Sequence, residues 1–153
     1  HTVDKAVQAG DAKAMRDAAG ALAENYPRTL YASMAALVSG RFYYDRNDLK
    51  SAKAQLQWVI ERASAEDFRD LARLRLAAVL LDEKGYDEAL KQLDAPHAAP
   101  YDAQYSALKG DILVAKGQPA EAKAAYKVAL DKGDERHTQF RESVRMRLEA
   151  LGS

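Results

Sequence analysis

The chain has 153 residues, the length of one ordinary domain, and its 48% hydrophobic and 30% charged residues predict a folded chain. It contains no cysteine, which excludes disulfides, thiolate metal sites and a cysteine nucleophile. Because 23 basic residues balance 23 acidic ones, the charge argues against a broad electrostatic grip on nucleic acid or an anionic membrane.

The composition predicts an all-helical fold. The sequence contains 31 alanines but only 8 valines, 2 isoleucines and 3 threonines. Alanine is the best helix former, and the β-branched residues that favour strands are scarce. No apolar run is long enough to span a bilayer. The chain opens with His1 rather than Met, so we expect a fragment whose upstream part, including any anchor, lies outside the sequence.

Glycines and prolines divide the chain into segments of helical periodicity joined by short turns. A short helix is predicted at about 2–9. Thr29 and Asp48 are expected to cap the helices that follow them, and Ser64 with Asp67 has the spacing of a capping box. About eight helices then follow one another in chain order, at 12–25, 29–45, 49–63, 64–84, 86–94, 100–116, 119–132 and 136–151.

The most informative pattern is an internal repeat aligned on Ala52, Ala89 and Ala122. Twelve residues before each alanine lies a small residue, nine before lies a large apolar one, and four after lies another large apolar one. These positions are Gly40, Tyr43 and Leu56 in the first copy, Ala77, Leu80 and Leu93 in the second, and Gly110, Leu113 and Tyr126 in the third.

Each copy reads as a helix, a tight turn and a second helix. The small residues are expected where the two backbones come closest, because a larger side chain would push the helices apart. A single hairpin cannot bury its own apolar face, so neighbouring hairpins should stack into a solenoid. A non-repetitive helical bundle with coincidental alanines is the alternative.

The spacing resembles the tetratricopeptide repeat. This resemblance implies one domain over 1–153, with repeat units at about 33–64, 66–95 and 101–132 and a terminal helix at 136–151. The pattern is degenerate, because the aromatic residue often found four positions before the small one is replaced by Ala36, Arg73 and Ser106.

In tetratricopeptide solenoids the first helix of each pair lines a concave groove, and the register gives the positions that would line it here. Most of these are apolar, which is typical of a surface that binds an extended or helical polypeptide. They are Met34, Leu37, Arg41 and Tyr44, then Leu71, Leu74, Ala78 and Leu81, then Gln104, Ala107, Asp111 and Val114.

The terminal helix suggests an alternative in which the groove is filled by the chain itself. Its apolar stripe could fold into the trough and fill it, leaving no room for a partner. The stripe consists of Phe140, Val144, Leu148 and Leu151.

Catalytic motifs are absent from the sequence. There is no G-x-G-x-x-G, P-loop, G-x-S-x-G or H-E-x-x-H pattern. His97 lies between Asp94 and Asp102 and could suggest a metal or acid–base site, but the prolines around it favour a solvated turn. We therefore predict a protein that is not an enzyme, with no cofactor and no metal site.

Several short motifs resemble the YfgM-type family of ancillary subunits of the bacterial SecYEG translocon. They are Asn25, the stretch from Asn47-Asp48-Leu49 to Lys53-Ala54-Gln55-Leu56, Leu74-Arg75-Leu76-Ala77, and Gly110 with Lys116-Gly117. The resemblance covers about 4–151.

This family resemblance implies the periplasmic domain of a protein held in the inner membrane by one N-terminal helix that is absent from the sequence. It also implies protein partners: the translocon, a membrane-anchored periplasmic isomerase-like chaperone, and unfolded secreted clients. The sequence thus favours a non-catalytic interaction module at the Sec translocon. A scaffold for cell-envelope or cell-division machinery is the alternative.

Overall fold

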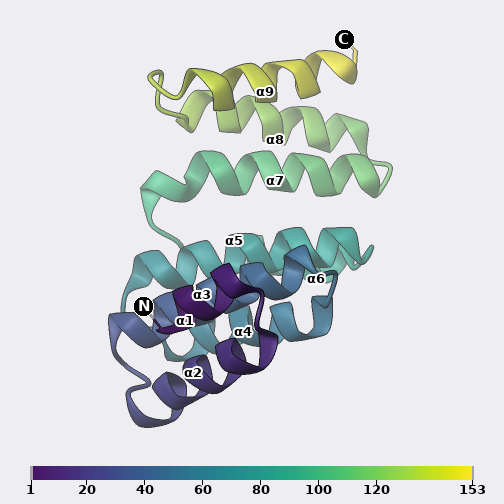
Figure 1. Cartoon of the computed structure of the whole chain (residues 1–153). Coiled ribbons are helices and arrows are strands. Elements are labelled where there is room, and N and C mark those ends of the chain that lie inside the picture. The colour runs from purple at the N-terminus through teal and green to yellow at the C-terminus, as the bar shows by residue number, and fades with distance from the viewer. Residues whose placement is uncertain (1, 153) are drawn as a thin grey trace. The chain divides into compact units, whose positions relative to one another are not determined.

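The computed structural model describes residues 2–152, and over this range the chain forms nine α-helices, one short 3-10 helix and no strand (Figure 1). The all-α prediction is confirmed, and each helix range expected from the sequence has a counterpart among the nine. The helices are α1 (Thr2–Ala9), α2 (Ala12–Asn25), α3 (Leu30–Asp45), α4 (Leu49–Arg62), α5 (Glu66–Asp82), α6 (Tyr86–Leu93), α7 (Asp102–Ala115), α8 (Pro119–Lys132) and α9 (Thr138–Ala150), with the 3-10 helix at Ala99–Tyr101.

Residues at the helix starts behave largely as their types predict. The Thr29 hydroxyl accepts from the Ala32 amide at 3.2 Å, and the Asp48 carboxylate accepts from the Ser51 amide at 3.2 Å. Pro119 opens α8, where a missing amide hydrogen costs nothing. By contrast α5 begins at Glu66, two residues beyond the predicted start at Ser64.

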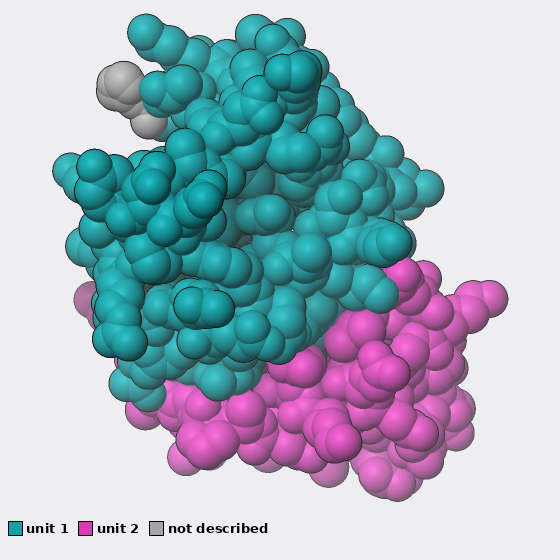
Figure 2. Space-filling model, turned by 90° about the horizontal axis from the view of Figure 1, so that it is seen from below, with its two compact units in different colours: residues 1–79 teal, residues 80–153 magenta. Residues whose placement is uncertain are grey.

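The helices fall into two compact units, residues 1–79 and residues 80–153, which Figure 2 shows in two colours. The boundary lies inside α5, so the second predicted repeat unit is divided between them. One domain over the whole chain, with three repeat units, stays a prediction.

Unit 1 contains two helical hairpins and most of α5. The α1–α2 hairpin packs through both its helices on α3, and α3 packs along α4. Met15 and Ala52 are fully buried in its core. The core residues are Val3, Ala6, Met15, Ala19, Ala35, Phe42, Tyr43 and Ala52.

Unit 2 stacks its helices in chain order. Helix α6 packs on α7, α7 on α8, and α8 on α9, and Figure 1 shows the last three lying side by side. Alanines line the α7–α8 contact, which lets these helices approach closely. The core residues are Ala107, Leu113, Ala122, Ala125, Tyr126, Ala129 and Val144.

The same turn joins the two helices of each repeat. Asn47, Lys84 and Gly117 all have positive φ, at 59°, 63° and 82°. In each copy the amide of the following residue donates to the carbonyl oxygen of the residue nine positions before the repeat alanine. These hydrogen bonds, 2.8–2.9 Å long, run from Asp48 to Tyr43, from Gly85 to Leu80 and from Gln118 to Leu113. This is the Schellman ending of a helix. The turns recur at the spacing of the alanines, which supports the repeat register.

The small residues of the repeat lie in the interior as predicted. Gly40, Ala77 and Gly110 are buried, and the three repeat alanines are fully buried. The two glycines differ in how much room they have. A Cβ at Gly40 would lie 3.6 Å from Leu56 side-chain atoms, whereas one at Gly110 would lie 2.6 Å from Cδ1 of Tyr126. Only Gly110 therefore requires the absence of a side chain.

Candidate functional site

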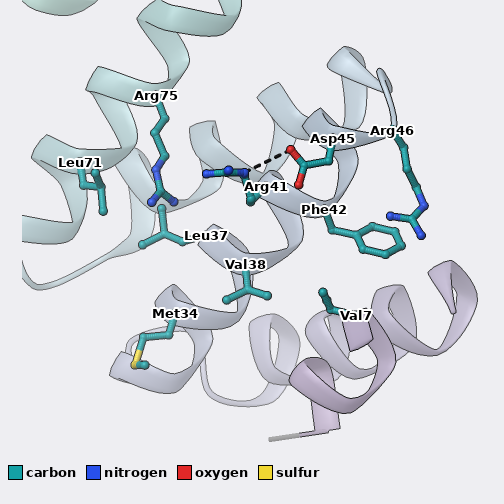
Figure 3. A pocket seen from close by; sticks show the side chains of 10 residues that line it. All are labelled: Val7, Met34, Leu37, Val38, Arg41, Phe42, Asp45, Arg46, Leu71 and Arg75. Carbon is teal, nitrogen blue, oxygen red and sulfur yellow. Dashed lines mark hydrogen bonds and ion pairs between the residues drawn. The ribbon is translucent and has the colours of Figure 1, made fainter. Parts of the chain in front are cut away.

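Unit 1 contains a groove that runs along α3. It has a volume of about 540 Å³; α3 forms its floor, and α1 and α5 contribute residues to its sides (Figure 3). Val7 comes from α1, and Leu71 and Arg75 come from α5. We call this the α3 groove; its lining residues are Val7, Met34, Leu37, Val38, Arg41, Phe42, Asp45, Arg46, Leu71 and Arg75.

The α3 groove brings together four of the residues expected from the repeat register. These are Met34, Leu37, Arg41 and Leu71. Leu37 is only 6% exposed and belongs to the floor, whereas Met34 is 51% exposed. Tyr44, Leu74 and Ala78 do not line the α3 groove, and Leu81 belongs to unit 2.

Sequence reasoning missed six lining residues, and four of them follow one rule. Val38, Phe42, Asp45 and Arg75 each lie one position after a predicted residue. A side chain on a helix leans toward the N-terminus, so a given spot on the surface is covered by a residue about one position further along the chain. Applying this displacement to the repeat register would have found them. Val7 and Arg46 lie outside the register.

The charged groups of the α3 groove lie near the C-terminal end of α3. Arg41 Nε donates to Asp45 Oδ1 at 3.1 Å, and both side chains are more than half exposed. Exposed pairs at this spacing contribute only about 0.3–0.5 kcal/mol. The Arg46 guanidinium lies over the Phe42 ring, 3.7 Å from its centroid, in a cation–π contact. Figure 3 shows Arg75 extending from α5 toward Leu37 and Arg41.

A second cavity continues the apolar surface toward the start of α3. It also measures about 540 Å³ and shares Met34 and Val38 with the α3 groove. Its other sides are formed by Thr2, Val3 and Asp4 of α1, by Leu22 and neighbouring residues of α2, and by Tyr31, which is 75% exposed. Apart from Thr2 and Asp4, the lining from the start of α3 to its charged end is apolar or aromatic.

The predicted groove positions of the third repeat unit have different surroundings. Gln104 and Val114 are exposed, whereas Ala107 is buried in the core of unit 2. Asp111 is engaged by its own chain, because Arg147 Nη1 donates to both its carboxylate oxygens at 2.8 and 2.9 Å. The hydroxyl of Tyr126 donates to Asp111 Oδ1 at 2.5 Å. This cluster ties α7, α8 and α9 together.

The surroundings of Tyr126 change its acidity. Burial raises the pKa of its hydroxyl far above the usual value, and the hydrogen bond to the Asp111 carboxylate raises it further. The Arg147 charge opposes these two effects but does not reverse them. Tyr126 therefore stays a neutral donor to Asp111 at all ordinary pH values.

The apolar stripe of the terminal helix is used within unit 2. Val144 is fully buried, and Phe140, Leu148 and Leu151 pack partly buried against the same core. Ala107 belongs to this core, and Asp111 pairs with Arg147 of α9. The chain itself therefore covers two of the four predicted groove positions on α7.

His97 has a local role in the turn between α6 and α7. Its Nε2 lies 2.8 Å from Asp102 Oδ1, its Nδ1 lies 3.0 Å from the Ala95 carbonyl oxygen, and its ring stacks on Tyr105 with centroids 4.1 Å apart. The side chain is half-buried, so it is less solvated than the prolines suggested. These contacts fix the turn.

The described residues bring together no group of three or more histidine, aspartate or glutamate side chains that could hold a metal ion. Over residues 2–152, no helix is both long and apolar enough to cross a bilayer.

Comparison with known proteins identifies the class of protein that this fold represents. The profile of the tetratricopeptide repeat-like domain matches residues 1–153. The chain belongs to this family.

Curated relatives define the relationship more closely. The chain is 32% identical over 130 residues to the ancillary SecYEG translocon subunit of Neisseria gonorrhoeae, covering 85% of this chain and 62% of that protein. It is 33% identical over 108 residues to the subunit of the same name in Escherichia coli, covering 71% and 52%. The Haemophilus influenzae subunit is 29% identical over 113 residues, covering 74% and 55%. The resemblance to the YfgM-type family is thus confirmed, and the chain spans somewhat over half the length of these relatives.

Proposed function

We propose that this chain is a non-catalytic protein-interaction module of an ancillary subunit of the Sec translocon. The names of its relatives support the association with SecYEG. The α3 groove supports the interaction role, because an exposed apolar hollow in a repeat protein is typical of a polypeptide-binding surface. That groove is the observation that carries the proposal.

In this proposal the domain lies on the periplasmic face of the inner membrane, held by an N-terminal helix in the longer protein. Its partners are the translocon, a membrane-anchored periplasmic isomerase-like chaperone, and emerging secreted chains. Unfolded clients offer apolar segments, which fit the apolar lining around Met34 and Val38. The groove positions proposed for contact in unit 1 are Met34, Leu37, Arg41 and Leu71.

Photocrosslinking in living cells tests this function. A benzophenone side chain replaces Met34, which is half exposed within the α3 groove, in the full-length protein. Met34 is a better site than Leu37, because a substitution in the buried floor would disturb the core. Gln57, exposed on α4 and outside the groove, provides the matched control.

Adducts are then probed with antibodies to translocon subunits and to the chaperone. We expect these adducts at position 34 and not at position 57. Adducts with envelope-synthesis or division enzymes would favour the scaffold role instead. Equal labelling at both positions would contradict a role for the groove.

A further inference from the structure

The charge of the α3 groove differs from that of the chain as a whole. The chain has a formal net charge of zero. The groove is lined by three arginines and a single aspartate, and its remaining residues are apolar. A surplus of two positive charges therefore borders an apolar hollow.

The positive charges are gathered at one end. Arg41, Asp45 and Arg46 lie in the last turns of α3 or directly after it. The opposite end of the same face carries Tyr31 and Met34, 75% and 51% exposed, beside Asp4 of α1. The side chains that α3 itself presents thus change from apolar to cationic along the helix.

The arginines at the charged end are suited to accept a carboxylate from a partner. The one bond from Arg41 to Asp45 joins two solvent-exposed groups, so a partner carboxylate can replace Asp45 at little cost. Arg46 is exposed and lies with its guanidinium over the Phe42 ring. A contact with the ring face does not use the N–H donors of the guanidinium. Arginine binds carboxylates through two parallel hydrogen bonds.

We propose that the α3 groove selects a polypeptide segment in which large apolar side chains are followed by acidic ones. The apolar side chains lie over Met34 and Val38, and the carboxylates lie against Arg41 and Arg46, with Arg75 adding positive potential from α5. This inference rests on the proposed function, since it names the chemistry of the partner that the groove accepts.

A polypeptide fits this surface better than an anionic membrane does. The floor residue Leu37 is 6% exposed, and α1 and α5 as well as α3 contribute residues to the groove above it. A flat bilayer cannot enter such a hollow, whereas an extended or helical segment can. The neutral chain also lacks the excess of basic residues that draws proteins to anionic lipids.

Fluorescence anisotropy with a labelled peptide tests the inference on the whole chain. One peptide carries leucine and phenylalanine in its first half and glutamates in its second, and the comparison peptide carries glutamines in place of the glutamates. We expect the glutamate peptide to bind roughly tenfold tighter or more at low salt. The advantage should shrink as salt is raised, because exposed charges are screened.

Two matched variants localise the effect. Arg46→Gln should remove most of the preference for glutamate, whereas Arg62→Gln should leave it unchanged. Both residues are exposed and belong to unit 1, but Arg62 lies outside the groove. Far-UV circular dichroism verifies that both variants keep their helices.

Several results would overturn the inference. Equal affinity for the two peptides would show that the groove does not select acidic residues, and so would an unchanged preference for the glutamate peptide in Arg46→Gln. Neither result would contradict the proposed function. Failure of the glutamate peptide to bind at about 1 mM would also reject the inference, and the crosslinking experiment would then decide the proposed function separately. Arg46-dependent binding to anionic phospholipid vesicles, without peptide binding, would assign the surface to a membrane.

Discussion

Substituting alanine for each of the two repeat glycines tests why the small residues are there. In Gly110→Ala the new Cβ would lie 2.6 Å from Cδ1 and 2.8 Å from Cζ of Tyr126. In Gly40→Ala the nearest atoms lie at 3.6 Å, an ordinary contact. The two changes are chemically identical and both lie within helices, so they differ only in the space available.

The expected free energies follow from these distances. Alanine in a helix is favoured over glycine by about 0.8–1.0 kcal/mol, so Gly40→Ala should stabilise the protein by up to about 1 kcal/mol. In Gly110→Ala the buried Tyr126 ring must move by roughly 1 Å, and such overpacking costs about 1–3 kcal/mol. The movement also strains the hydrogen bond to Asp111, whose loss costs about 1.5–3 kcal/mol. We expect a net destabilisation of about 1–3 kcal/mol.

Urea unfolding followed by far-UV circular dichroism measures both changes. A slope of about 2 kcal/mol per M would turn the expected difference between the variants, about 2–4 kcal/mol, into about 1–2 M in midpoint. Trp58, the only tryptophan, lies in α4 and reports separately on the unit that contains Gly40. A Gly110→Ala protein as stable as the Gly40→Ala protein would refute the close-approach argument.

Two further predictions concern unit 2. The folded state raises the pKa of Tyr126, so the stability that its neutral hydroxyl contributes is present below the unfolded pKa of about 10 and is lost as pH rises toward the folded pKa. Tyr126→Phe should remove this alkaline loss of stability. In an alkaline absorbance titration, the variant should lack one late tyrosine ionisation that the parent protein shows. Lys84 has φ of 63°, which costs a non-glycine residue about 1–2 kcal/mol, so Lys84→Gly should raise the urea midpoint. Lys84→Ala keeps the strain and should not raise it; an equal gain in both variants would contradict the argument.

The repeat was readable from the sequence because it depends on residue size at fixed positions. Gly40, Ala77 and Gly110 sit where a large side chain would separate two helices, and this constraint acts within a hairpin. The helix starts at Thr29 and Asp48 were also predictable, since a cap involves residues only three positions apart. Such short-range rules require no knowledge of the tertiary structure.

Contacts between residues far apart in the sequence could not be predicted from it. Asp111 was expected in a binding groove, but it pairs with Arg147, 36 residues away, and no local pattern marks that choice. Val7 reached the α3 groove because the α1–α2 hairpin packs on α3, ahead of the three copies that the repeat register covers. A repeat register fixes which face a residue occupies, but not which neighbour covers that face.

The distribution of residue sizes in unit 1 gives the groove its significance. The contact between α3 and α4 places small residues such as Gly40 and Ala52 beside large buried ones such as Leu56. Yet Tyr31 and Met34 remain exposed together on one face of α3, beside the cavities they line. Scattered exposed apolar residues are ordinary on a protein surface, but a contiguous apolar surface beside a hollow is typical of an interaction site. Large side chains that the core does not use, placed where a partner can reach them, are what the proposed binding role requires.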